Sequence, residues 1–157
     1  IIRTDKLKEI NGGDWEGVPY SDLPGRWPNE SYTWDNALHL HKMPNGEDIH
    51  EFQARLVAEI ERIVRNNKGR NICIVTHGTA MRALLCHFHG WEIEKINDIP
   101  WCDNTAVTIV DAKDDGGYEV IEESNCTHLD DDLSTLKNQE WFLEYQKRFN
   151  NRKAGRS

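Results

Sequence analysis

The sequence predicts a three-layer α/β domain, built on a mixed and mostly parallel sheet with an antiparallel edge. Asn71–Thr76 is an almost continuous apolar run, as expected for a strand whose two faces are both covered. Asp48–Asn66 repeats apolar residues every three or four positions, which is the pattern of an amphipathic helix. Two β-type runs, Thr105–Asp111 and Tyr118–Glu122, flank a connection that contains Gly-Gly, which predicts a hairpin.

The chain has no internal repeats and no low-complexity linker, so we expect one domain over residues 1–157. Ile1–Thr4 is a short strand candidate, and Glu9–Gly17 is a loop punctuated by glycines. Residues 18–44 carry prolines and aromatic residues with little periodicity. We expect this segment to be an excursion with short helical turns, of the kind that covers an active site.

Three helices are expected further along the chain. Asp48 and Glu51 form a capping-box pattern at the start of the long helix. A second helix, Thr79–His89, directly follows the apolar run, and a third is expected at Asn138–Phe149. The terminal stretch Arg148–Ser157 is expected to fray.

Composition excludes several classes of protein. A formal net charge of −8 argues against a nucleic-acid binder, which presents a basic face. No apolar run approaches the roughly 18 residues of a membrane span, and no signal-peptide pattern is present. The four cysteines are widely spaced, without a C-x-x-C pair, which indicates reduced thiols and a cytoplasmic location. The sequence leaves the oligomeric state open, with a homodimer among the options.

The segment Ile72–Arg82 (ICIVTHGTAMR) carries the clearest chemical signal. It places His77 between an apolar run and the start of a helix, where free N–H groups and a glycine favour a bound anion. Histidine suits proton transfer near neutral pH and attack on phosphorus. On this segment alone, a hydrogen-bonded structural histidine is the commoner outcome, by about two to one.

Four short motifs occur in order along the chain. They are Leu7–Gly17 (LKEINGGDWEG), Gly46-Glu47-Asp48 with Phe52 and Arg55, Thr76-His77-Gly78, and Asn125–Leu129 (NCTHL). Together they resemble the histidine phosphatase (phosphoglycerate mutase-like) superfamily, whose members share L-x-E-x-x-x-G-x-W-E-G, then G-E-S/T-x-x-x-F/V-x-x-R, S/T-H-G and N-x-S/T-H-L. The resemblance covers residues 2–130, and Asp48 stands where the family usually has Ser or Thr.

The resemblance implies roles for individual residues. His77 corresponds to the second active-site histidine, which stabilises the transferring phosphoryl group, and Glu9 corresponds to the general acid. Gly78 and Thr79 would offer backbone N–H groups to the substrate phosphate, and helix capping by Thr79 is compatible with that role. Arg82 either binds substrate or anchors a carboxylate elsewhere.

The nucleophile of the family is missing from this chain. Family members begin with a strand that ends in Arg-His-Gly, and no Arg is followed by His here. The resemblance therefore implies a phosphoglycerate mutase-like α/β/α domain that is incomplete at its N-terminus. It implies a phosphomonoester hydrolase, or a phosphomutase, that works through a phosphohistidine whose histidine lies outside this chain.

Two alternatives remain open. The chain could be a catalytically dead remnant that keeps a phosphate- or partner-binding surface, with Trp27–Trp34 as its contact patch. Alternatively, a second chain could supply the first strand and its histidine. For the enzyme, the expected ligand is a small phosphorylated substrate, and neither a nucleic acid nor a membrane is expected as a partner. No metal or other cofactor is expected, because neither His39-x-His41 nor Cys86-His87-x-His89 has the spacing or the accompanying ligands of a metal site.

Overall fold

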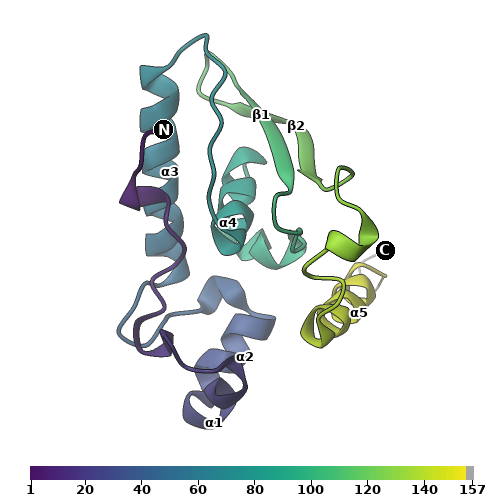
Figure 1. The fold of residues 1–157 in the computed structure, drawn as a ribbon. Helices are drawn as coiled ribbons and strands as arrows, with labels where there is room; N and C mark the ends of the chain where they lie inside the picture. The colour runs from purple at the N-terminus through teal and green to yellow at the C-terminus, as the bar shows by residue number, and fades with distance from the viewer. Residues whose placement is uncertain (155–157) are drawn as a thin grey trace. The chain divides into compact units, whose positions relative to one another are not determined.

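The computed structural model describes residues 1–154, apart from the side chains of residues 131, 152 and 153. The chain divides into two compact units, Ile1–Ile99 and Pro100–Ser157 (Figure 1). The expectation that residues 1–157 form a single domain stays a prediction. All of the residues predicted to form the site lie in the first unit.

The first unit is helical. Its long helix, α3 (Ile49–Asn66), contacts α4 (Gly78–Phe88). Two shorter helices, α1 (Leu23–Arg26) and α2 (Pro28–Asn36), lie in the segment that precedes α3. Short 3-10 turns connect these helices, at Asp5–Leu7, Gly13–Trp15, Tyr20–Asp22, Leu38–Leu40 and Ile93–Asp98. The prediction of short helical turns within residues 18–44 is therefore confirmed.

Helix α3 begins as predicted. The Asp48 carboxylate accepts hydrogen bonds from the N–H groups of His50 (2.9 Å) and Glu51 (2.8 Å), and the Glu51 carboxylate accepts one from the Asp48 N–H (3.4 Å). This capping box satisfies N–H groups that the helix itself leaves without partners. The apolar stripe of α3 is buried, and its buried apolar members are Ile49, Phe52, Leu56 and Ile60.

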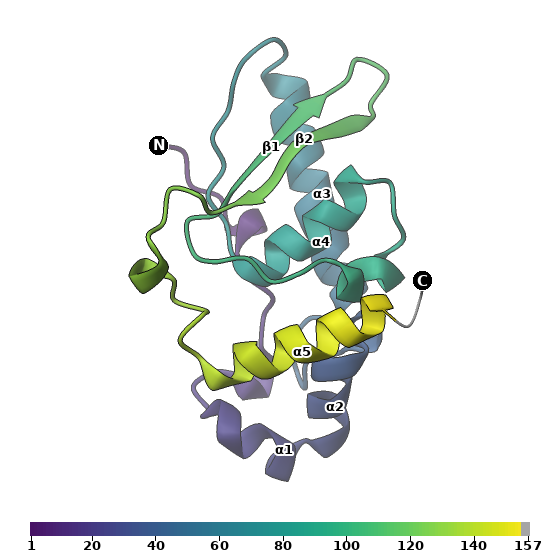
Figure 2. The same ribbon diagram turned by 90° about the vertical axis from the view of Figure 1, so that its right-hand side faces the viewer.

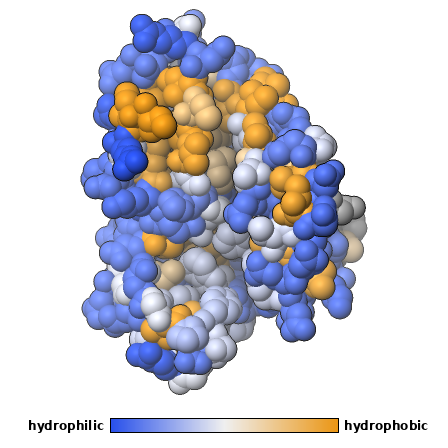
Figure 3. All heavy atoms as spheres, viewed as in Figure 1, coloured by the Kyte–Doolittle hydropathy of each residue, from blue (hydrophilic) through white to orange (hydrophobic). Residues whose placement is uncertain are grey.

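The prediction of a buried strand at Asn71–Thr76 is wrong for this structure. The segment runs between α3 and α4 without pairing to any strand in the described part of the chain (Figure 1). Ile72, Ile74 and Val75 are 44%, 38% and 88% exposed. A strand needs main-chain hydrogen bonds to a neighbouring strand, and among the described residues none is formed by this segment. Ile1–Thr4 also forms no strand. Figure 3, in the same view as Figure 1, shows apolar side chains at the surface of the molecule.

The second unit contains the predicted hairpin. Strands β1 (Val107–Ala112) and β2 (Tyr118–Asn125) pair antiparallel, with register shifts at the Val107 end (Figure 2). They form the one sheet among the described residues, so the antiparallel edge is present there and the larger parallel sheet is not.

The last helix is longer than the sequence predicts. Helix α5 (Glu140–Ala154) carries an apolar cluster of Phe142, Tyr145 and Phe149, against which Trp101 and Leu136 pack. This cluster packs the helix as far as Phe149. Fraying of Arg148–Ser157 is therefore wrong as far as Ala154, and residues 155–157 lie outside the described residues.

None of the helices in the described part of the chain has the length and the apolar character that a bilayer crossing requires.

An aromatic cluster fastens residues 18–44 to the preceding loop. The Trp15 ring lies 6.5 Å from Trp27, 6.0 Å from Trp34 and 5.2 Å from His41, measured between ring centroids. Trp34 also meets His41 edge-on, at 5.1 Å. Aromatic contacts at these separations contribute beyond their buried area. Trp15 thereby holds the short helices of this segment against the loop that follows Glu9.

His41 is the buried polar centre of this cluster. Its side chain is 1% exposed, with Nδ1 3.0 Å from the Thr33 hydroxyl and Nε2 3.2 Å from the Met43 sulfur. Burial disfavours the charged ring, so the pKa of His41 is lowered from 6.5 to about 4. The folded protein therefore holds this ring in its neutral form.

Acidification is expected to weaken the protein through His41. Between pH 6.5 and 4 the unfolded chain binds a proton at this ring and the folded chain does not, so stability falls as the pH falls through this window. His41→Phe should remove roughly 2 kcal/mol of that pH-dependent loss. Urea unfolding at several pH values measures it. The exposed His50→Phe serves as control, and an unchanged pH dependence in His41→Phe would contradict this account.

Two glycines allow two loops to lie backbone against backbone. The Asp14 N–H donates to the Pro44 carbonyl (2.8 Å), and the Glu47 N–H donates to the Asn11 carbonyl (3.1 Å). A Cβ on Gly13, whose φ is +53°, would lie 2.1 Å from the Pro44 oxygen. A Cβ on Gly46 would lie 2.3 Å from the Asn11 oxygen. Any side chain at either glycine would force the loops apart.

Gly46→Ala is expected to destabilise the protein by about 1–3 kcal/mol, because the added methyl group meets main-chain atoms that cannot turn aside. Gly25→Ala is the matched control, since a Cβ there has nothing within 4 Å. The measurement is the free energy of unfolding of both variants. Equal stability of the two variants would show that the loops separate freely.

Candidate functional site

The carboxylate of Glu9 lies at the N-terminal turn of helix α4. Its Oε2 accepts a hydrogen bond from the Thr79 N–H (2.9 Å), and its Oε1 accepts one from the Ile10 N–H (3.1 Å). Thr79 is 2% exposed, so the first of these contacts is sheltered from water. The structure therefore brings together Glu9 and Thr79, which are 70 positions apart in sequence.

His77 is the N-cap residue of the same helix. Its backbone is extended, with φ −116° and ψ 171°, and its carbonyl accepts the Met81 N–H at 2.9 Å. Its side chain is exposed. The neighbouring Thr76 hydroxyl donates to the Leu7 carbonyl (2.7 Å). The segments that carry His77 and Glu9 are thus joined twice, on either side of His77.

The electrostatics of this helix end favour negative charge. An α-helix carries roughly half a positive charge at its N-terminus, and the first turn of α4 contains no acidic residue to offset it. Gly78 and Thr79 are the first two residues of the helix, and their N–H groups are not used by helical bonds. The Glu9 carboxylate occupies the position at which such a helix end holds an anion.

The side chain of Arg82 is buried and donates hydrogen bonds to main-chain carbonyls. Its side chain is 4% exposed, its Nε donates to the Ile99 carbonyl (3.0 Å), and its Nη2 donates to the Ile96 carbonyl (2.8 Å). These bonds brace the turn at Ile93–Asp98 against α4. Of the two carboxylates considered as its partners, Glu16 accepts the Gly12 N–H, and Glu47 pairs with Arg55. A substrate-binding role for Arg82 stays a prediction.

Sequence reasoning missed the role of Arg55. Arg55 and Glu47 form a two-point ion pair, with Nε–Oε1 at 2.7 Å and Nη2–Oε2 at 2.8 Å. The hydrogen bonds from Arg55 lower the pKa of the Glu47 carboxyl. Arg55 also reaches the backbone on either side of Lys8, including the Glu9 carbonyl. The motif that joins Glu47 to Arg55 was visible in the sequence, but the carbonyl contacts were not.

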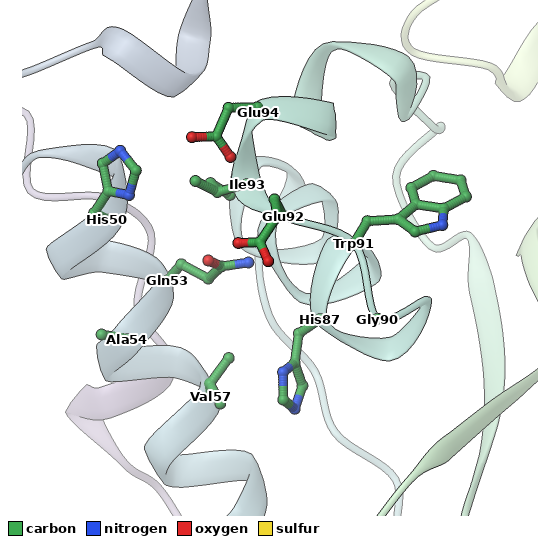
Figure 4. A pocket seen from close by; sticks show the side chains of 10 residues that line it. All are labelled: His50, Gln53, Ala54, Val57, His87, Gly90, Trp91, Glu92, Ile93 and Glu94. Carbon is green, nitrogen blue, oxygen red and sulfur yellow. The ribbon is translucent and has the colours of Figure 1, made fainter.

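A pocket of about 440 Å³ lies between α3 and the C-terminal end of α4 (Figure 4). His50 and Gln53 face it from α3, and Glu92 and Glu94 face it from the opposite side. None of the predicted site residues lines it, and it is at the other end of α4 from His77. It is therefore separate from the candidate site. Within residues 1–154, no group of three or more His, Cys, Asp or Glu side chains is arranged to hold a metal ion.

Curated relatives share the sequence of this region. The chain is 23% identical over 110 residues to "Phosphoserine phosphatase 1" of Hydrogenobacter thermophilus, which covers 70% of this chain and 52% of that protein. It is 30% identical over 94 residues to "Uncharacterized phosphatase PhoE" of Bacillus subtilis, which covers 60% of this chain and 43% of that protein. The chain spans about half the length of these relatives.

A solved structure shares the fold. "Bacillus stearothermophilus YhfR" superimposes with a TM-score of 0.77 at 27% identity, covering 82% of this chain and 63% of that chain. The named relatives are enzymes, and they include phosphatases and 2,3-bisphosphoglycerate-dependent phosphoglycerate mutases. The profile of the histidine phosphatase superfamily (branch 1) matches residues 1–126, and this chain belongs to that superfamily.

Proposed function

We propose that this chain forms the part of a phosphomonoester hydrolase, or phosphomutase, that carries the general acid Glu9 and the phosphoryl-stabilising His77. In this proposal, the histidine that accepts the phosphoryl group lies outside the chain, because no Arg-His-Gly occurs within it. The substrate is a small phosphomonoester, in keeping with the phosphatases and mutases among the relatives. A cytoplasmic location belongs to the same proposal.

One observation carries the proposal: the Glu9 carboxylate accepts the Thr79 N–H at the helix end that follows His77. A general acid must stand within hydrogen-bonding reach of the leaving oxygen, and a phosphate is held best at a helix N-terminus. The contact supports both roles at one place.

The proposed reaction proceeds in two steps. In the first, the external histidine attacks phosphorus while the P–O bond to the leaving group breaks, and Glu9 gives its proton to the leaving oxygen. His77 and the N–H group of Gly78 stabilise the charge on the remaining oxygens, while the Thr79 N–H donates to Glu9. In the second, the oxygen of water or of a substrate hydroxyl attacks phosphorus, the P–N bond of the phosphohistidine breaks to release the external histidine, and the attacking oxygen gives a proton to Glu9.

The exposed apolar run supports the idea that a strand is supplied from outside. Ile72, Ile74 and Val75 have the composition of a strand covered on both faces, although they are exposed here. We propose that this run becomes a central strand of the three-layer fold when the segment bearing the nucleophile lies beside it. Residues 18–44 then cover the site, held to its loop by Trp15.

The binding-remnant alternative stays open, with a contact patch at Trp27–Trp34 that is partly exposed. Trp27 and Trp34, proposed as its exposed surface, are partly buried against Trp15. Tyr32 is the exposed ring of this stretch, at 67%. An alternative that remains consistent with the exposed run at residues 72–75 is a second chain that supplies both the strand and the histidine.

The first experiment is the intact mass of the natural protein that contains this chain, followed by assay with p-nitrophenyl phosphate. A mass well above 18.2 kDa, with an acid-labile phosphoryl group trapped on histidine outside residues 1–157, is the expected result. A mass of 18.2 kDa, with no hydrolysis and no phosphohistidine, would overturn the hydrolase proposal and leave the binding or two-chain alternatives.

Loss of either proposed catalytic side chain should lower kcat. Glu9→Gln removes the transferable proton and should reduce kcat by about 100- to 10,000-fold for substrates with poor leaving groups. His77→Asn should reduce kcat for all substrates. Steady-state kinetics on the natural protein measure both effects, with Glu61→Gln on the exposed side of α3 as control. Normal kcat in Glu9→Gln with a poor leaving group would exclude Glu9 as the acid.

A further inference from the structure

The guanidinium of Arg55 is shared between one carboxylate and the backbone that leads to Glu9. Nη1 donates to the carbonyls of Lys6 (2.8 Å) and Lys8 (3.2 Å), and Nη2 donates to the carbonyl of Glu9 (3.3 Å). The remaining bonds go to Glu47. Arg55 therefore contacts the main chain at Glu9 itself and at two positions shortly before it.

Glu47 closes the arrangement on the other side of Glu9. Its Oε2 accepts the Asn11 N–H (2.8 Å), and its own N–H donates to the Asn11 carbonyl (3.1 Å). The backbone is thus fixed before Glu9 by Arg55 and after it by Glu47. Because these two side chains are bonded to each other, the segment around Glu9 is held by one continuous network.

The Arg55–Glu47 pair is less exposed to solvent than the Arg65–Glu61 pair on the surface of the same helix. The side chains of Arg55 and Glu47 are 18% and 21% exposed. The side chains of Arg65 and Glu61, both on α3, are 64% and 46% exposed, and Arg65 Nη1 lies 3.5 Å from Glu61 Oε2. Exposed pairs contribute little, whereas a two-point, partly buried pair fixes geometry.

We propose that Arg55 is the positioning residue of Glu9, and that Glu47 orients the guanidinium for this task. This inference rests on the proposed function, in which Glu9 is the general acid. Arg55 touches no substrate: it sets where the Glu9 backbone lies, and therefore whether the carboxylate reaches the N-terminus of α4. Lysine cannot replace it, because a single ammonium lacks the planar set of donors that spans a carboxylate and several carbonyls.

The first test reads the Glu9–Thr79 contact directly, without using activity. In the natural protein with isotopically labelled threonine, the Thr79 amide resonance reports whether a carboxylate accepts its proton. Glu9→Gln defines the resonance position without the charged acceptor. Arg55→Gln should move the resonance most of the way to that position, and the matched control Arg65→Gln should leave it in place. An unmoved Thr79 resonance in folded Arg55→Gln would overturn the inference.

The second test uses kinetics. Arg55→Gln should lower kcat by roughly 10- to 100-fold with little change in KM, because a displaced acid affects the chemical step and not substrate binding. In the Glu9→Gln background, the same substitution should cause no further loss, because its effect passes through Glu9. A full additional loss in the double variant would mean that Arg55 acts on stability or on another group, and would overturn the inference.

Folding is controlled with two milder variants. If Arg55→Gln does not fold, Arg55→Lys and Glu47→Gln keep part of the network and should give smaller changes of the same kind in the Thr79 resonance. Normal Thr79 resonances in both would count against the inference. The amide measurement also separates the two proposals. If the natural protein has no phosphatase activity but Arg55→Gln still displaces its Thr79 resonance, the proposed function is refuted and the positioning role of Arg55 is supported.

Discussion

The ion pair between Arg55 and Glu47 connects helix α3 to the segment that carries Glu9. Arg55 lies on helix α3, and Glu47 precedes that helix by two residues, yet together they fix backbone as far away as Lys6 and Asn11. A charge pair that is partly withdrawn from water is stable only if its remaining donors are also satisfied. Here the main-chain carbonyls near Glu9 satisfy them. The stability of the pair and the placement of the proposed acid are therefore a single physical requirement.

The close approach of the two loops around Asn11 and Pro44 requires glycine at two positions. Gly13 and Gly46 let two backbones approach so closely that their peptide groups hydrogen-bond across the gap. Asp48 then caps α3, the helix that carries Arg55. Capping, close approach and ion pairing act on adjacent residues. Each of these three interactions reduces the number of backbone conformations open to the residues beside it. Together they fix the loop after Glu9 without strand pairing.

Patterns that depend on local physics were predicted well, and those that depend on distant partners were not. The capping box at Asp48, the stripe of α3 and the hairpin follow from spacing and turn residues, and all three are present. Asn71–Thr76 has the composition of a buried strand, but no strand pairs with it in the described part of the chain. For the site, helix-end geometry could be anticipated at His77. The bonds of Arg55 and Arg82 to carbonyls could not, since every residue carries a carbonyl and sequence does not distinguish them.

The uncovered run at residues 72–75 also has a consequence for how the protein is made. Four consecutive residues, Ile-Cys-Ile-Val, contain no proline and no charge, which are the usual means by which an edge resists pairing with another molecule. During synthesis the run leaves the ribosome after α3 and before α4. A chain whose synthesis pauses at this stage exposes residues 72–75, with which another chain can pair. The risk of aggregation rises with the concentration of such chains. The order and timing of translation therefore belong to the physical chemistry of this protein as much as its final contacts do.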